Sequence, residues 1–337
     1  MTETPRSLWF DYAVAACSVW IANGFFLDAW AHGHVPVETF FTPYHGVFYS
    51  GMLAMVVVLA TYWLRHRGLP PGYRLAVVGI PVFFLAGIGD LIWHELLGIE
   101  EGVDALLSPT HQLLGLGIFM LASGPIASVL RDRRASTSWQ RQLPLVLSLA
   151  SWLTLVHFGT AYAFDPAAGH SNAPPVVDGF SRSYFTALSI GYYKSASSVL
   201  ILLVQAAFMT GFALWAVASL RLFRGAFTIF YIVANTAAAA AFTNQTPLLL
   251  TTLLQSLVAG AVADLCVARM DPNAERPNAY RAFAFVLPLV YSGVYIIVTA
   301  LTDHPLWWDW NVSLGAWLWT GVLGFGMSFV GLARRAA

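Results

Sequence analysis

The chain has 337 residues, of which 58% are hydrophobic and 10% charged, and its mean hydropathy is +0.66. Soluble domains carry about 25% charged residues, so this composition excludes an ordinary soluble domain. It predicts an all-α, multi-pass membrane protein in contact with the lipid bilayer. The formal net charge is zero, which gives no indication of a nucleic-acid partner.

Apolar runs long enough to cross a bilayer, roughly 20 residues each, recur along the whole chain. They cover residues 8–28, 43–64, 74–95, 109–130, 142–163, 195–220, 225–243, 247–268, 281–302 and 311–333. Arginines gather on every second connection and at the C-terminal end, and acidic residues on the opposite connections. Because short cytoplasmic loops collect Lys and Arg, we expect about ten spans in the cell membrane with both termini in the cytoplasm.

The longest connection, residues 164–186, is rich in Pro, Gly and Asp, and is therefore predicted to be an outer loop. It divides the chain into two halves of five helices. We expect the first half, residues 1–163, to bind metal. The second half, residues 187–337, contains runs of small residues that are typical of helix packing surfaces, and is predicted to be scaffold.

The first half contains one pattern twice, in residues 24–51 (the first motif) and 87–117 (the second motif). In each motif an Asp is followed four residues later by a His. A polar stretch without Lys or Arg comes next, then Thr/Ser-Pro-x-His, and six residues after that His a Gly. Thr42 and Ser108 suit helix N-caps, and the prolines that follow them suit the first helical position.

Each motif has the composition of a metal site. Residues four apart lie on one face of a helix, so the Asp and the first His present an oxygen and a nitrogen to one point, and the next helix adds a third ligand. Two His and one carboxylate with open coordination positions are typical of non-haem iron and other divalent-metal sites. Open positions indicate chemistry or exchange rather than a closed structural site. The predicted ligands, toward the outer face, are Asp28, His32, His45, Asp90, His94 and His111.

The alternative is that the Asp and His residues are ordinary caps near the lipid headgroups. A membrane protein rarely retains costly ionisable residues twice in register without a use, so the repeat favours metal binding. The motifs leave open whether there is one dinuclear site or two mononuclear sites.

Other residues near the motifs receive weaker interpretations. His157, Asp303 and His304 are candidate outer-shell partners or interfacial residues. His34 lies off the face shared by the ligands and is interpreted as a solvated loop residue. Several aromatic residues line an apolar substrate pocket or form an interfacial belt. They are Trp30, Phe40, Phe41, Tyr44, Phe48 and Trp93.

The two motifs together resemble the C subunit of the particulate methane and ammonia monooxygenases, the copper membrane monooxygenases. The resemblance covers roughly residues 8–130. In that family the first motif supplies Asp, His and His to one intramembrane copper site, and the second supplies Asn, His and His to a neighbouring site. The matching residues here are Asp28, His32 and His45 for the first site and Asp90, His94 and His111 for the second.

The resemblance implies copper, oxidation of a small apolar substrate with oxygen, and other membrane subunits or a second copy of the chain as partners. The chain departs from the family in three ways: its first motif ends the first helix, about six helices have no match, and Asp90 stands where the family has Asn. A carboxylate is a harder ligand, so iron or zinc is an alternative metal there. Rival interpretations are a copper delivery or transport protein and a non-catalytic subunit of a larger membrane oxidase. Transport requires a polar path across the bilayer, whereas the middles of the first four helices are nearly all apolar.

Overall fold

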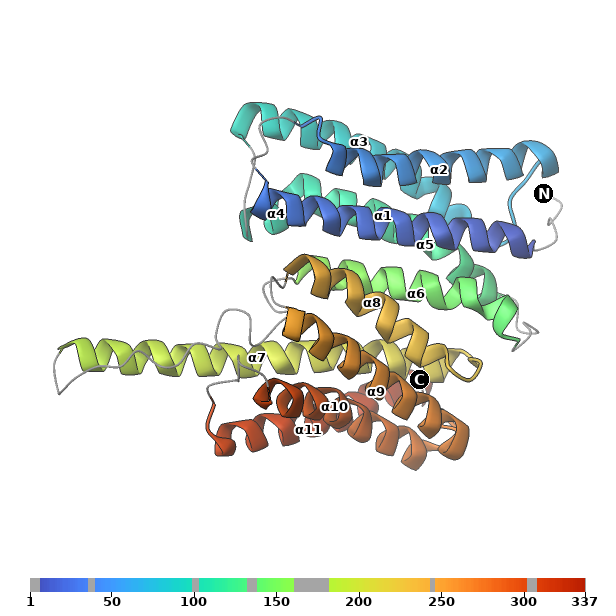
Figure 1. The fold of residues 1–337 in the computed structure, drawn as a ribbon. Helices are drawn as coiled ribbons and strands as arrows, with labels where there is room; N and C mark the ends of the chain where they lie inside the picture. The colour runs from blue at the N-terminus through green and yellow to red at the C-terminus, as the bar shows by residue number, and fades with distance from the viewer. Residues whose placement is uncertain are drawn as a thin grey trace. The chain divides into compact units, whose positions relative to one another are not determined.

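The computed structural model of the protein describes residues 7–35, 40–98, 103–131, 138–160, 182–242, 246–301 and 308–336. Within these ranges every regular element is an α-helix (Figure 1). The helices are α1 (Leu8–His34), α2 (Pro43–His66), α3 (Arg74–Leu97), α4 (Val103–Leu107), α5 (Pro109–Arg131), α6 (Trp139–Gly159), α7 (Arg182–Ser219), α8 (Ala226–Phe242), α9 (Thr246–Met270), α10 (Pro277–Ala300) and α11 (Trp310–Ala336). The predicted all-α fold class is confirmed.

Nine helices in the described part of the chain are long and apolar enough to cross a membrane. The remaining predicted span, residues 225–243, corresponds to α8, whose apolar part is the shorter Ala226–Ala240. A helix of 17 residues is about 25 Å long, compared with about 30 Å for the hydrocarbon core of a bilayer. The multi-pass membrane class is confirmed, with α8 as a short helix among the long ones.

Helix α7 begins earlier than expected. It starts at Arg182, so the end of the predicted outer loop 164–186 is helical, and residues 161–181 lie outside the described ranges. The prolines and glycines that predicted this loop end at Gly179. No proline follows within α7, and the next glycine is Gly191, which explains the early start.

The chain forms two compact units that do not follow the predicted halves. The first comprises Met1–Ala161 and Leu220–Phe242, and the second comprises Tyr162–Ser219 and Thr243–Ala337. Helix α8 therefore packs with α1 to α6, against the expectation that residues 187–337 form one half. The side-chain amide of Gln142 on α6 donates to the carbonyl oxygen of Arg221 (2.6 Å) and accepts from the N–H of Phe223 (2.8 Å), and these bonds fix the entry of α8 to α6.

The glycine that ends each motif allows two helices to approach closely in both cases. Gly51 on α2 faces Ile21 on α1, and a Cβ at Gly51 would lie 2.9 Å from the Cγ1 atom of Ile21. Gly117 on α5 faces Phe83 on α3, and a Cβ there would lie 2.8 Å from the Cβ atom of Phe83. Ile21 and Phe83 each precede the Asp of their motif by the same seven residues. The repeat is therefore a repeat of packing: α1 pairs with α2 as α3 pairs with α5.

In the second unit, α10 and α11 are joined by polar contacts along their interface. The indole N–H of Trp317 on α11 donates to the carbonyl oxygen of Leu289 on α10 (2.7 Å). The hydroxyls of Ser292 and Thr320 lie 2.8 Å apart. Small polar residues commonly join membrane helices in this way. The scaffold role of this part of the chain stays a prediction.

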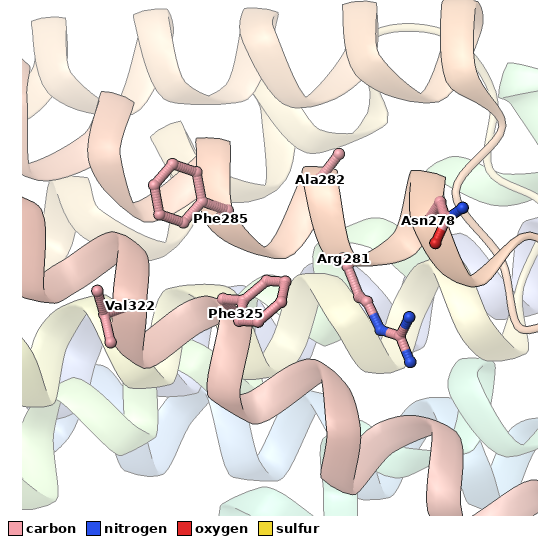
Figure 2. Close-up of a pocket in the computed structure, with 6 residues that line it drawn as sticks. All are labelled: Asn278, Arg281, Ala282, Phe285, Val322 and Phe325. Atoms are coloured by element: carbon pink, nitrogen blue, oxygen red, sulfur yellow. The ribbon is translucent and has the colours of Figure 1, made fainter.

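The second unit also carries an open groove between α10 and α11 (Figure 2). Its lining consists of Asn278, Arg281, Ala282, Phe285, Val322 and Phe325. Figure 2 shows Asn278 and the guanidinium of Arg281 toward one end, with Phe285 and Val322 toward the other. That guanidinium lies 4.8 Å from the ring centroid of Phe329. Because no predicted metal ligand lines the groove, the candidate site lies elsewhere.

Candidate metal centre

The six predicted ligands all lie in the first unit, at the ends of four helices. Two come from the last turns of α1 and two from the last turns of α3, and the first turns of α2 and α5 supply one each. Thr42 is the N-cap of α2, with the hydroxyl oxygen accepting from the backbone N–H of His45 (3.2 Å), and Pro43 opens the helix. The predicted N-cap role of Thr42 is confirmed.

The first motif brings its three predicted ligands together. The two carboxylate oxygens of Asp28 face different imidazoles: one lies 3.5 Å from Nε2 of His32 on the same helix, and the other lies 3.4 Å from Nδ1 of His45 on α2. The three residues each offer a ligand atom within 4.8 Å of the others. The spacing of four residues therefore produces the predicted arrangement, completed by the next helix.

In the second motif the Asp carboxylate again lies between two imidazoles, although His111 is not in the second set of converging ligand atoms. One oxygen of Asp90 lies 3.6 Å from Nε2 of His94, and the other lies 3.5 Å from Nε2 of His111. The carboxylate also accepts a hydrogen bond from the hydroxyl of Thr110 (2.8 Å), and that hydroxyl lies 2.8 Å from the hydroxyl of Ser108. Sequence reasoning missed Thr110, although its place beside His111 at the start of α5 marks it as a neighbour of the ligands.

The two motifs lie against each other. The ring of His94 is 6.3 Å from that of His32 and 6.4 Å from that of His45, measured between centroids. A second set of ligand atoms within 4.8 Å of one another consists of His45, Asp90 and His94. The six predicted ligands therefore form one continuous cluster, and His45 belongs to both of its sets.

The cluster is buried and incompletely hydrogen-bonded. Asp28 is 5% exposed and Asp90 is 0% exposed, and within the described ranges the ion-pair partners of both carboxylates are imidazoles. Buried atoms with no hydrogen-bond partner include Nδ1 of His32, Nε2 of His45 and Oδ2 of Asp90. Buried polar atoms are normally satisfied, and buried charges are normally paired or coordinate metals. The donor types, their burial and these unsatisfied atoms fit a metal ion.

Aromatic rings surround the cluster, but they are only partly the predicted ones. Phe40 stacks on His45 (4.7 Å between centroids) and lies 6.1 Å from His94, whereas its neighbour Phe41 is 81% exposed. The prediction that Phe41 lines an apolar pocket is therefore not supported by its position. Trp30 was also predicted to line the pocket. Its ring stacks on that of the exposed His34, with 4.7 Å between centroids, and lies 6.4 Å from that of Tyr44.

Tyr49 is a neighbour of the centre that sequence reasoning missed. Its ring is 6.3 Å from that of His45, and its buried hydroxyl has no hydrogen-bond partner. Gly87, one turn before Asp90, leaves the space that this hydroxyl fills, because a Cβ there would lie 2.6 Å from the oxygen. The spacing of four residues from His45 is the signal that could have identified Tyr49.

Of the three predicted outer-shell residues, the structure describes only His157. His157 is buried on α6 and is in neither set of converging ligand atoms. Asp303 and His304 fall outside the described residues. At the opposite end of α1, the buried Asp11 accepts a hydrogen bond from the hydroxyl of Tyr73, which gives this carboxylate a structural partner.

Comparison with known proteins adds no relative. No protein-family model, no curated protein and no solved structure matches this chain. The resemblance to the C subunit of the copper membrane monooxygenases therefore stays a prediction based on the two motifs.

Proposed function

We propose that this protein is an integral membrane metalloprotein whose buried Asp/His cluster binds transition-metal ions, near the extracytoplasmic ends of α1, α2, α3 and α5. The observation that carries this proposal is the convergence of the two motifs into sets of one carboxylate and two imidazoles, in which Nε2 of His45 and Oδ2 of Asp90 are buried without a hydrogen-bond partner. A buried carboxylate among neutral imidazoles needs a cation to compensate its charge.

We further propose that the centre carries out oxidative chemistry on a small apolar substrate, with copper as the metal. Three protein ligands leave coordination positions open, and a redox-active metal bound there supplies one-electron and oxygen chemistry. The chain holds the ligands in place: the Asp90 carboxylate is oriented by the Thr110 hydroxyl, and the His45 ring by Thr42 and Phe40. The aromatic residues exclude water and provide apolar surface for a hydrocarbon-like molecule. Iron or zinc is the alternative metal at Asp90, where a carboxylate replaces the amide of the resembling family.

Copper delivery is the rival function, and the burial of the centre argues against rapid exchange. His45, Asp90 and His94 are all buried, as are Phe40 and Phe48 beside them. A delivery site must release its ion to an acceptor protein, which requires access to the ligands. We therefore favour a centre that retains its metal, and the same measurements distinguish the two functions.

The experiment is metal analysis of the detergent-purified protein, combined with oxygen consumption. We expect metal to survive purification in the wild type and to be reduced in His32→Ala, His94→Ala and His111→Ala. His34→Ala is the matched control, because His34 is an exposed histidine that hydrogen-bonds the Trp30 carbonyl and belongs to neither ligand set. A wild type that retains no metal overturns the proposal. Rapid transfer of all bound copper to an acceptor, without oxygen consumption for any small alkane, alcohol or quinol, favours delivery.

A further inference from the structure

His45 occupies a place between the two motifs that no other ligand shares. It belongs to the first motif by sequence, and it is a member of both sets of converging ligand atoms. Its ring centroid lies 5.9 Å from that of His32 and 6.4 Å from that of His94. Two independent mononuclear sites would need separate ligands, whereas this cluster has one imidazole in common.

The two nitrogens of His45 have different surroundings. Nδ1 lies 3.4 Å from the Asp28 carboxylate and 3.1 Å from the Thr42 hydroxyl, so this nitrogen faces the first motif. Nε2, on the other side of the ring, is buried and has no hydrogen-bond partner. The second set therefore has a nitrogen available in His45 that the first set does not use.

The orientation of this ring is fixed by its neighbours. The rings of Phe40 and Tyr49 lie nearly parallel to it, with interplanar angles of 29° and 23°. Thr42 holds the start of α2 through its bond to the backbone N–H of His45. A ligand whose rotamer is locked by packing keeps both nitrogens in place for binding.

We propose that His45 bridges two metal ions as an imidazolate, so that the cluster is one dinuclear centre. The first ion is bound by Asp28, His32 and Nδ1 of His45. The second is bound by Nε2 of His45 together with Asp90, His94 and His111. This inference rests on the proposed function, because it requires the cluster to bind metal.

The charges of this centre largely compensate one another and leave a net charge of +1. A neutral imidazole carries one proton on one ring nitrogen, and binding an ion at each nitrogen displaces that proton to solvent. The imidazolate and the carboxylates of Asp28 and Asp90 then supply three negative charges against the four positive charges of two divalent ions. With metal–nitrogen bonds of about 2.0 Å, the two ions are separated by roughly 6 Å across the ring. Asp90, in place of a neutral amide, supplies one of the charges that this pair of ions requires.

The test uses copper(II) added to the metal-free wild-type protein in detergent. We expect two copper ions per chain and magnetic coupling between them through the imidazolate, so that the integrated electron paramagnetic resonance intensity falls well below the total copper. One ion per chain, or two ions whose full intensity is visible, overturns the bridge and leaves the proposed function standing. No bound copper overturns both.

Variants of the two motifs separate a bridge from independent sites. His45→Gln and His45→Ala should abolish the coupling and weaken binding of both ions, whereas His111→Ala should weaken only the second. If His45→Gln and His45→Ala lose one ion and leave the other with unchanged affinity, His45 serves the first site alone and the inference is wrong. The wild-type measurement stands by itself if a variant does not fold, and His34→Ala provides the control for loss of an unrelated imidazole.

Discussion

Replacing Asp90 by Asn should raise the stability of the metal-free protein while it weakens metal binding. The substitution keeps the shape of a side chain that is 0% exposed and removes its charge. The two imidazoles lie 3.5 and 3.6 Å from the carboxylate, beyond the usual range of a good hydrogen bond. Of the three contacts of the Asp90 carboxylate, only the one with the Thr110 hydroxyl, at 2.8 Å, is as short as a good hydrogen bond.

The magnitude follows from two opposing contributions. Burying an ion costs several kcal/mol even after relaxation, and one hydrogen bond to a charged group offsets about 1.5–3 kcal/mol of this cost. An uncompensated cost of about 2 kcal/mol remains, which for a chain of 337 residues corresponds to an apparent melting temperature higher by roughly 3 °C in Asp90→Asn without metal. With metal the sign reverses. Even loss of a residue that only orients a ligand weakens binding by about 10–100-fold, so loss of the charged ligand should cost at least about 100-fold, or about 2.7 kcal/mol.

The assay is thermal unfolding of both proteins in detergent, once with a chelator and once with excess copper. The account requires Asp90→Asn to be the more stable protein with chelator and to gain less from copper than the wild type. Metal analysis should show loss from the second site while Asp28, His32 and His45 keep their ion. If Asp90→Asn destabilises the metal-free protein and binds the same amount of copper, Asp90 is a helix-capping residue and not a ligand.

Three further predictions concern the supporting structure. Thr110→Val should weaken the second ion about 10-fold, since it removes one hydrogen bond to a charged group; unchanged affinity by titration would contradict this. Gly117→Ala should destabilise the protein by about 1–3 kcal/mol, whereas Gly115→Ala, with nothing within 4 Å, should be neutral or stabilising in thermal unfolding. A Cys placed at Gly102 should react with an impermeant reagent from outside the cell; reaction only after opening the membrane would reverse the topology.

The local geometry of the centre could be predicted from the sequence. The spacing of four residues in helical segments places Asp28 with His32 and Asp90 with His94, because this spacing is a property of any α-helix. Thr42 and Pro43 predict the start of the next helix, where the third ligand lies, because Thr is a preferred N-cap and Pro a preferred first helical residue. The nine long apolar helices in the described part of the chain were likewise predicted, because apolar length is the direct requirement for crossing a bilayer.

The parts that could not be predicted depend on how helices pack. Whether the two motifs face each other is decided by the approach of α1, α2, α3 and α5, and the sharing of His45 follows from that approach. Phe40 and Phe41 are adjacent residues of the same type, so the sequence does not show which one is buried. The direction of the chain before Thr42 buries Phe40 and exposes Phe41. The segment that leads into α8 is bound to α6 by Gln142, a polar residue whose sequence context does not identify its partner.

The most direct test of the central claim is X-ray absorption spectroscopy at the copper edge of the copper-loaded protein. Ligation by the Asp/His cluster predicts a first shell of nitrogen and oxygen at about 2.0–2.2 Å, with the outer scattering of imidazole rings. Both features should be lost in the His32→Ala/His94→Ala double variant and retained in His34→Ala. A sulfur shell, which would place the ion at cysteine or methionine side chains, or a spectrum that the double variant leaves unchanged, would contradict this claim.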